Sequence, residues 1–381
     1  MSLKVIVLGP AYPYRGGLAT IMEMLARTFN RRGDSAEVMT FTVQYPSLLF
    51  PGKSQFRSGE APADIQITRC VSTINPLNWS KVGRMIRREA PDLLVFKYWT
   101  PFMAPCFGRI ARLARRNGRT RTVCQIDNVI PHEHHFFDKM LTRYFVDSMD
   151  GFVYMSHEVG RDLAQFTTGQ KCVYSPHPLF ENLGARLERG EACRRMGLNP
   201  EVRYMLFFGL IRDYKGLDML LEAWSKLKTE GKIEGRRLIV AGEFYTDKKP
   251  YTELIDRLGL ADDVILHDWF VPDDEVPAYF SIADALVLPY RTATQSGVTQ
   301  IAYNFDVPMI ATNVGGLGEI VLDGQTGIVC SPDVEGIAGA IDQFYTQNLG
   351  EKFTANMPEA KKRFSWESAV EALVECAEIK K

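Results

Sequence analysis

Two cationic side chains stand close together in a loop that follows an apolar run. The run over 205–209 leads into Leu210-Ile211-Arg212-Asp213-Tyr214-Lys215-Gly216, so Arg212 and Lys215 lie just beyond a predicted strand. Open α/β sheets bind ligands at the carboxyl ends of their strands. The guanidinium fork of arginine and the ammonium of lysine both suit the oxygens of a diphosphate. The spacing predicts a phosphate site at Arg212 and Lys215, and two surface charges on a solvated loop are the alternative interpretation.

A second segment with small polar residues opens a predicted helix over 297–304. It reads Pro289-Tyr290-Arg291-Thr292-Ala293-Thr294-Gln295-Ser296-Gly297-Val298 and follows the apolar run 286–288. Ser296 or Thr294 can cap this helix through a side-chain oxygen. The first backbone N–H groups of a helix favour an anion. We therefore expect a second phosphate or a sugar hydroxyl to bind at Gly297 and Val298.

Two further turns are rich in glycine. Gly16-Gly17 follows the predicted first strand and opens a helix, and Gly315-Gly316 is followed by Leu317-Gly318-Glu319. Glycine lets the backbone approach a ligand closely. Tight turns without a ligand use the same residues, so these two segments alone leave both interpretations open.

Asp127 and Asn128 end an apolar run in the first half of the chain, followed by Val129-Ile130-Pro131-His132-Glu133-His134-His135. Asp127 is a candidate general base, or a group that orients an acceptor hydroxyl; a turn-forming Asp-Asn is the alternative. The histidines lack the His-Glu-x-x-His spacing of a zinc site because Phe136 takes the last position. Contacts to an acceptor from His132 and Glu133, or a surface loop, fit better than a metal. No Asp-x-Asp triplet occurs, so we expect no metal-bound diphosphate.

The composition is that of an ordinary globular protein with two domains. The chain has 381 residues, 46% of them hydrophobic and 24% charged, with a net charge of −1, which argues against nucleic acid as a partner. Seven cysteines without a Cys-x-x-Cys pair indicate reduced thiols and a cytoplasmic location. No signal peptide or membrane-spanning run is recognised. A local basic cluster has two interpretations, a solvated helix face or a docking face for anionic lipid. It consists of Arg109, Arg112, Arg115, Arg116, Arg119 and Arg121.

Short apolar runs alternate with amphipathic stretches in both halves of the chain, which predicts an α/β fold with two doubly wound, Rossmann-like domains and a cleft between them. Apolar runs with little alternation indicate parallel strands covered on both faces. The pattern loosens around Ser175-Pro176-His177-Pro178, where prolines exclude regular structure, and His177 is interpreted as a linker residue. We place the domains at 1–178 and 179–355, and expect the helix within 356–381 to cross back to the first domain.

Taken together, the motifs resemble the retaining family 4 glycosyltransferases, or group 1 glycosyltransferases, of the GT-B fold. The resemblance rests on Gly-x-x-Arg-x-x-Lys-Gly over 209–216, on Ala241-Gly242-Glu243, on Ser296-Gly297-Val298 and on the turn at Gly315. It implies that Arg212 and Lys215 bind the donor diphosphate and that the amides of Gly297 and Val298 face the phosphate or the donor sugar. It also implies that Gly16 and Gly17 border the phosphate and acceptor side, and that the nucleobase is flanked by Trp269, Phe270 and Val271.

The chain departs from the family at the paired glutamates. Counted back from Pro308, the two positions hold Ala293 and Ile301, so neither the sugar nor the ribose contact of the family is available. Thr294 or Gln295 is expected to take over the sugar contacts.

The resemblance implies metal-independent, retaining transfer of a hexose from a UDP- or GDP-linked sugar to a glycan or lipid-linked glycan. We expect no cofactor besides the nucleotide sugar. We also expect the protein to be cytoplasmic, with a peripheral contact at the inner face of the membrane as one option. A non-catalytic partner subunit and a nucleotide-sugar epimerase are the alternatives.

Overall fold

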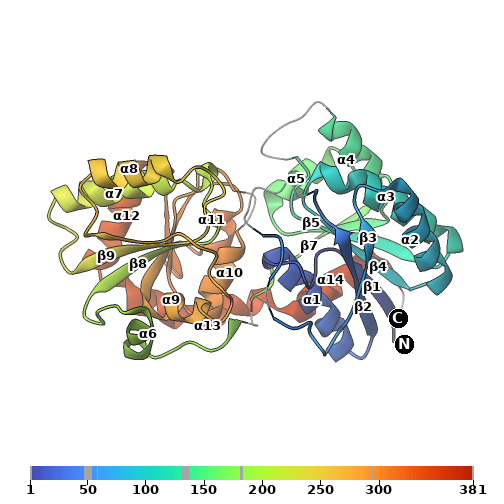
Figure 1. Cartoon of the computed structure of the whole chain (residues 1–381), viewed down its shortest axis with the longest axis horizontal. Coiled ribbons are helices and arrows are strands. Elements are labelled where there is room, and N and C mark those ends of the chain that lie inside the picture. Colours follow the sequence, from blue (N-terminus) through green and yellow to red (C-terminus); the bar gives the residue numbers. More distant parts are fainter. Residues whose placement is uncertain are drawn as a thin grey trace. The chain divides into compact units, whose positions relative to one another are not determined.

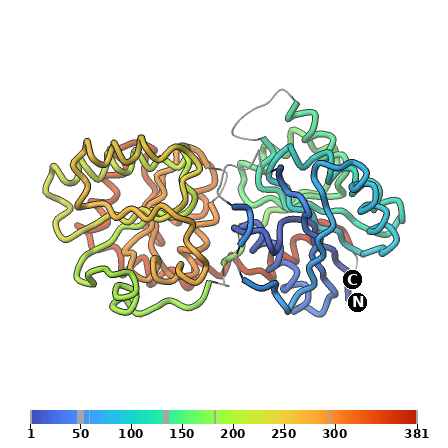
Figure 2. The backbone as a smooth tube through the Cα atoms, in the orientation of Figure 1, coloured from blue at the N-terminus to red at the C-terminus, as the bar shows by residue number. Residues whose placement is uncertain are grey.

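The chain divides into two compact units in a computed structural model that describes residues 2–46, 54–57, 59–130, 137–180, 183–293 and 296–379 (Figure 1). The first unit comprises Met1–Pro178 and Phe364–Lys381, and the second Leu179–Arg363. The tube in Figure 2 follows the blue and green first half into one unit and the yellow and orange segments into the other, while the red C-terminal end returns to the first unit.

The first unit contains a seven-stranded sheet in which every pairing is parallel. The strand order is β3-β2-β1-β4-β5-β6-β7. Its strands are β1 (Lys4–Leu8), β2 (Ser35–Val43), β3 (Gln66–Ser72), β4 (Leu93–Tyr98), β5 (Arg121–Ile126), β6 (Gly151–Tyr154) and β7 (Lys171–Tyr174). The edge strand β7 escapes prediction because its residues alternate between half-buried and exposed and form no apolar run.

Helices connect these strands and cover the sheet. They are α1 (Gly17–Arg31), α2 (Pro76–Glu89), α3 (Ala104–Ala114), α4 (Asp138–Val146) and α5 (His157–Ala164). Helices α2, α3 and α4 lie side by side (Figure 1) and join β4 in one core. The rings of Phe96 and Phe107 contact each other at a tilt of 51°, and Tyr98 stacks on Phe145 with ring centroids 4.2 Å apart. This packing explains why Phe96 and Tyr98 point to one face of the sheet, whereas Lys97 between them points to the other.

The C-terminal helix α14 (Trp366–Cys376) packs on α1, β6 and β7 (Figure 1). The first unit takes in the chain only from Phe364 rather than from 356. The reason is α13 (Leu349–Ala360), whose Phe353 and Met357 are buried in the second unit, where α13 packs on α12.

The second unit contains a six-stranded sheet, again with parallel pairing throughout. The strand order is β10-β9-β8-β11-β12-β13. Its strands are β8 (Arg203–Phe208), β9 (Arg236–Ala241), β10 (Val264–His267), β11 (Ala283–Leu288), β12 (Met309–Thr312) and β13 (Gly327–Cys330). Its helices are α6 (Arg189–Met196), α7 (Leu217–Thr229), α8 (Lys249–Arg257), α9 (Val276–Ile282), α10 (Gly297–Asn304), α11 (Leu317–Ile320), α12 (Val334–Thr346) and α13.

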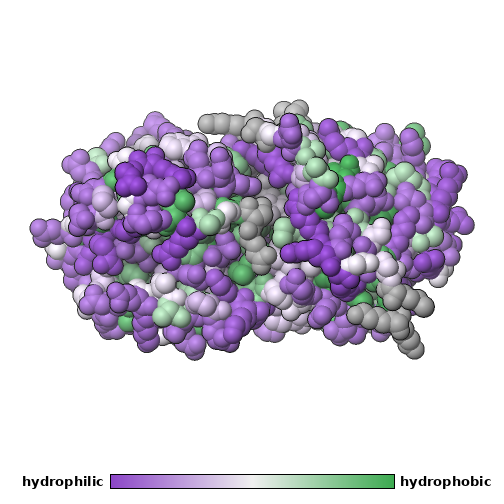
Figure 3. Space-filling view, turned by 90° about the horizontal axis from the view of Figure 1, so that it is seen from below, coloured by the Kyte–Doolittle hydropathy of each residue, from purple (hydrophilic) through white to green (hydrophobic). Residues whose placement is uncertain are grey.

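The predicted α/β class with two Rossmann-like units is confirmed by these two parallel sheets. Figure 3 shows hydrophilic residues over most of the visible face of each unit, with hydrophobic residues in small separate patches. The apolar side chains are instead buried between sheets and helices. In the part of the chain that the structure describes, no helix has the length and apolar character to cross a membrane.

Candidate functional site

Lys215 lies at the carboxyl end of β8, in a short 3₁₀ turn over Asp213–Lys215 that leads into α7. It is buried, and its Nζ atom lies 5.4 Å from the centroid of the Tyr290 ring. Within 183–293 and 296–379, no carboxylate lies within ion-pair distance of Lys215. Burial, with a further contribution from Arg212, lowers the pKa of the Lys215 ammonium. A buried cation without a counter-ion costs free energy, so this position is prepared for an anion.

The structure brings the two predicted phosphate-binding segments together. A Cβ atom on Gly209 would lie 3.3 Å from Nζ of Lys215 and 3.2 Å from Cγ2 of Val298. Gly216 has a φ of 66°, and its Cβ would meet the carbonyl oxygen of Pro289 at 2.0 Å. The absence of side chains at Gly209 and Gly216 therefore allows the loop after β8 to approach the start of α10.

The N-terminus of α10 differs from the expectation in one respect. Ser296 is the N-cap residue, but its side chain makes no capping hydrogen bond. Its Oγ atom instead lies 3.2 Å from the Tyr290 hydroxyl. The Ser296 side chain therefore accepts no hydrogen bond from the N–H groups of Gly297 and Val298. An anion site at a helix start requires that the N-cap side chain leave these groups to the anion. Thr294 and Gln295 lie outside the described residues.

Arg212 is exposed at the start of the same turn. Its guanidinium carbon lies 5.2 Å from the centroid of the Tyr245 ring, and no ion pair of Arg212 occurs among the residues described in this unit. The loop after β9 borders it, since Ile211 pairs with Phe244 in an isolated parallel bridge. Arg212 and Lys215 thus provide an exposed and a buried cation at one strand end.

The residues expected near the nucleobase follow β10. Trp269 is 43% exposed and stacks on His267, with ring centroids 4.6 Å apart and planes at 21°. The Nδ1 atom of His267 lies 2.8 Å from the Tyr279 hydroxyl, and burial lowers the pKa of His267. Phe270 is half-buried and Val271 is buried. Trp269 is therefore the member of this segment with an open aromatic face.

The positions of the missing glutamates belong to the same region. Ala293 is buried, and its carbonyl oxygen accepts a hydrogen bond from the N–H of Gly316 at 3.1 Å. The turn at Gly315, where φ is 48°, is thereby tied to the loop that precedes α10. Ile301 is half-buried on α10. Neither position offers a carboxylate.

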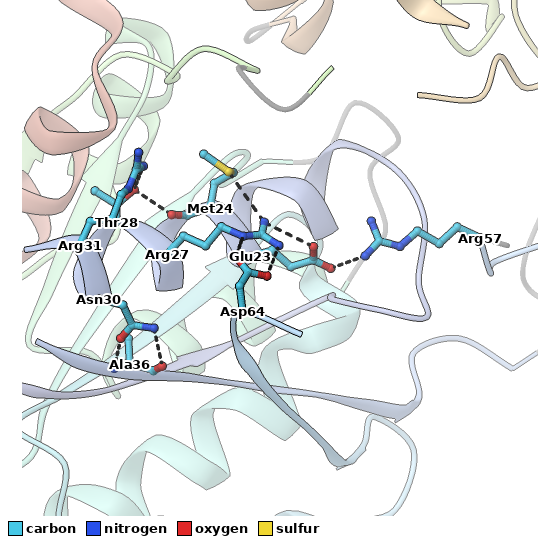
Figure 4. A network of polar contacts seen from close by, with 9 residues as sticks. All are labelled: Glu23, Met24, Arg27, Thr28, Asn30, Arg31, Ala36, Arg57 and Asp64. Carbon is cyan, nitrogen blue, oxygen red and sulfur yellow. Dashed lines mark hydrogen bonds and ion pairs between the residues drawn. The ribbon is translucent and has the colours of Figure 1, made fainter. Parts of the chain in front are cut away.

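In the first unit, the turn at Gly16-Gly17 opens α1, and Glu23 of the same helix contacts Arg27 and Arg57 (Figure 4). The buried carboxylate of Glu23 accepts hydrogen bonds from the Tyr12 N–H and from the Arg57 guanidinium, both at 2.9 Å. Arg27 approaches the other Glu23 oxygen at 3.8 Å. Glu23 thus fixes the loop in front of Gly16 at the carboxyl end of β1.

Asp127 follows β5 and is nearly buried, in an ion pair that the sequence did not predict. The Nζ atom of Lys97, whose side chain is fully buried on β4, donates to Oδ1 of Asp127 at 2.7 Å and to the Gln125 amide oxygen at 3.0 Å. The one available signal was a lysine inside the apolar run of β4. The contact with the Lys97 ammonium fixes the position of the Asp127 carboxylate, which favours the orienting role over the proton-accepting one.

His177 lies beside the boundary between the two units, where its interpretation as a linker residue placed it, and its side chain is buried. Burial and, to a smaller extent, the charge of Lys97 lower the pKa of His177 to about 4. Nδ1 of His177 lies 2.6 Å from the Pro178 carbonyl oxygen, which requires the proton on Nδ1. His177 is thus a neutral group near Lys97. His132 and Glu133 lie outside the described residues.

Three arginines of the predicted basic cluster bind other groups of the protein. Arg112 donates to the Tyr144 carbonyl and lies over its ring, Arg115 pairs with Asp150, and Arg119 pairs with Asp92. These contacts favour the structural interpretation for the three arginines. Among the described residues, no group of three or more His, Cys, Asp or Glu side chains is placed to hold a metal ion.

Two family models match the chain. The model described as "Glycosyl transferase 4-like domain" matches residues 16–176, and the one described as "Glycosyl transferases group 1" matches residues 202–347. The chain belongs to the group 1 glycosyltransferases. Each match falls within one of the two units, and the second contains the cations and α10.

A D-inositol 3-phosphate glycosyltransferase of Mycobacterium marinum is 30% identical over 198 residues, which cover 49% of this chain and 40% of that protein. The aligned part thus spans less than half of that relative. Sucrose-phosphate synthase of Thermosynechococcus elongatus has a similar structure, with a TM-score of 0.74 at 16% identity over 98% of both chains. The HepE protein of Anabaena, solved with UDP and glucose, has a TM-score of 0.72 at 16% identity over 98% of both chains. The GT-B fold expected from the sequence is confirmed.

Proposed function

We propose that the protein transfers a hexose from a nucleotide sugar to a glycan or lipid-linked glycan, without a metal and with retention of anomeric configuration. The observation that carries the proposal is the buried Lys215 ammonium without an ion-pair partner in the described part of its unit, beside the N-terminus of α10, which the Ser296 side chain does not cap. The bound UDP of the structurally similar HepE protein supports a nucleotide donor.

This arrangement fits the charge that develops in such a reaction. The leaving nucleoside diphosphate gains negative charge as its bond to the sugar breaks. Preorganised cations and helix N–H groups stabilise that charge without reorganisation. Lys215, Arg212 and the N–H of Gly297 are the groups that would do so. Since no carboxylate is recognised in the sequence as a nucleophile for a covalent glycosyl-enzyme, an attack from the same face as the leaving group is favoured.

Donor binding can be tested with nucleoside diphosphates. At a concentration of 100 times its Kd, a ligand stabilises the native state by about 2.7 kcal/mol, which should raise the Tm of a unit of this size by roughly 5–10 °C. UDP, GDP and ADP are compared by thermal shift, and affinity is measured by calorimetry. Arg212→Ala should weaken binding by roughly 10- to 100-fold, since it removes a charged hydrogen-bond donor.

Arg257→Ala, on the exposed end of α8, is the matched control and should bind as wild type does. If no nucleoside diphosphate binds wild type, the proposal is wrong. Binding without any nucleotide-sugar turnover favours a non-catalytic partner subunit, and turnover to a second nucleotide sugar without an acceptor favours an epimerase.

We further propose that α4 contacts an anionic membrane surface to reach a lipid-linked acceptor. Phe137 and Met140 are 60% and 61% exposed on this helix, and Tyr144 is 37% exposed. Lys139 and Arg143 are exposed between them. Apolar side chains flanked by cations are the features of helices that lie at a lipid interface.

Sedimentation with vesicles tests this contact. Lys139→Glu/Arg143→Glu should lower binding to vesicles of phosphatidylglycerol and phosphatidylcholine by at least about 30-fold, since each basic residue near such a surface contributes about 1 kcal/mol. Lys249→Glu/Arg257→Glu, on exposed sites of α8, makes the same change of charge and should bind normally. Equal loss in both double variants, or no binding by wild type, would contradict a role of α4.

A further inference from the structure

Three consecutive residues after β11, 289–291, contact the turn that carries Arg212 and Lys215. The carbonyl oxygen of Pro289 lies against Gly216 so closely that a Cβ there would be 2.0 Å away. The ring of Tyr290 lies beneath the Lys215 ammonium, and its hydroxyl reaches Ser296 at 3.2 Å. The segment therefore touches both halves of the candidate phosphate site.

Arg291 makes the most extensive of these contacts. Its backbone N–H donates to the Tyr214 carbonyl at 2.7 Å, and its Nη1 donates to the Asp213 carbonyl at 2.9 Å. The guanidinium also donates through both terminal nitrogens to the two carboxylate oxygens of Asp218, at 2.8 and 2.6 Å. Arg291 thus binds the carbonyls of the two residues before Lys215 and the first turn of α7.

These contacts fix geometry more than they stabilise the fold. The Arg291 and Asp218 side chains are 41% and 39% exposed, and ion pairs of that exposure contribute little to stability. A two-pronged arginine–carboxylate contact does, however, define direction. It holds the backbone on both sides of Lys215 in one orientation, in which Gly216 keeps its left-handed conformation.

We propose that Arg291 is a positioning residue for donor binding, which acts through the Asp213–Lys215 turn and sets where Lys215 meets the diphosphate. The proposal rests on the donor site proposed above. Its effect is confined to the phosphate part of the ligand, because its contacts reach the turn and α7. The aromatic segment at Trp269 follows a different strand, β10.

The test compares two ligands that differ only in their phosphates. Arg291→Met should weaken UDP, measured by calorimetry, by about tenfold or more, since misplacement of a charged contact by about 1 Å is costly. The same variant should bind uridine, measured by ligand-observed NMR, within twofold of wild type. A general loss of structure would weaken both ligands alike, so equal weakening would overturn the proposal.

Arg291→Lys separates positioning from charge. Lysine keeps the positive charge near the diphosphate but lacks the fork, so we expect it to bind UDP nearly as weakly as Arg291→Met. Full UDP affinity in Arg291→Lys would show that charge alone acts and would contradict the proposal.

A structural control lies at the opposite end of β8, where Arg203 donates to Asp284 at 2.9 Å. Arg203→Met removes an arginine–aspartate pair from the same unit and should leave UDP affinity unchanged; an equal loss in Arg203→Met would overturn the proposal. If wild type binds neither UDP nor another nucleoside diphosphate, the donor site itself is wrong; if wild type binds UDP and Arg291→Met binds it equally well, only the positioning role is wrong.

Discussion

Replacement of Lys215 by methionine should lower nucleotide-sugar turnover by about 10²- to 10³-fold, the loss typical of removing one preorganised group that stabilises developing negative charge. The Tm should not fall with the activity. Methionine fills a similar volume without a buried charge, so we expect the Tm to rise by roughly 2–4 °C, which corresponds to about 1 kcal/mol. Release of nucleoside diphosphate and a thermal melt measure the two effects on the same preparation.

A loss of turnover together with a rise in Tm is the result expected of a residue in the binding site rather than of a structural residue. Lys226→Met is the matched control, because Lys226 is an exposed lysine of α7 that pairs with Glu335. It should lose no activity and gain no stability. A Lys215→Met variant that loses activity and stability together would indicate that Lys215 is a structural residue.

The pH dependence of Lys215 has a defined sign. Burial lowers the pKa of the Lys215 ammonium from its ordinary value of 10.5, so the free site loses its charge at a lower pH than an exposed lysine does. Affinity for UDP should therefore decrease as pH rises through that lowered pKa. The stability of the ligand-free protein should change in the other direction over the same interval, since loss of the proton removes the cost of a buried charge.

Local spacing was sufficient to predict that Arg212 and Lys215 follow a strand and that a helix begins at Gly297. Arg212 and Lys215 were predicted because a short apolar run marks a strand end, and strand ends in parallel sheets share one edge. The helix over 297–304 was predicted with the bounds that α10 has. Both predictions depend on residues within about ten positions of one another, where the period of the sequence carries the information.

Contacts between distant segments were not predictable in this way. Arg291 reaches Asp218 across 73 positions, and Lys97 reaches Asp127 across 30. Whether two such side chains meet depends on strand order and register, which a single sequence does not specify. The side chain of Ser296, one of the two predicted caps of α10, contacts the nearby Tyr290 hydroxyl instead, and the other, Thr294, lies outside the described residues.

Replacement of Lys97 alone by methionine should destabilise the first unit by about 3–5 kcal/mol, because it removes one member of a buried ion pair. The side chain of Lys97 is fully buried and that of Asp127 is 10% exposed, so water gives Asp127 little compensation. The free energy of unfolding at neutral pH, measured by urea titration, gives the size of the effect.

The double variant Lys97→Met/Asp127→Asn separates the cost of an unpaired charge from the value of the pair. Removing both charges often has little effect on stability or increases it, so the double variant should recover most of the stability that Lys97→Met loses. Donor affinity measured with UDP should be unchanged in both, since Lys97 and Asp127 lie outside the unit that carries Lys215. If the double variant is as unstable as Lys97→Met, the lysine acts through its packing and not through its charge. If the double variant folds normally and binds UDP but transfer still fails, the ion pair of Lys97 and Asp127 is required for transfer, which agrees with a carboxylate that orients an acceptor hydroxyl.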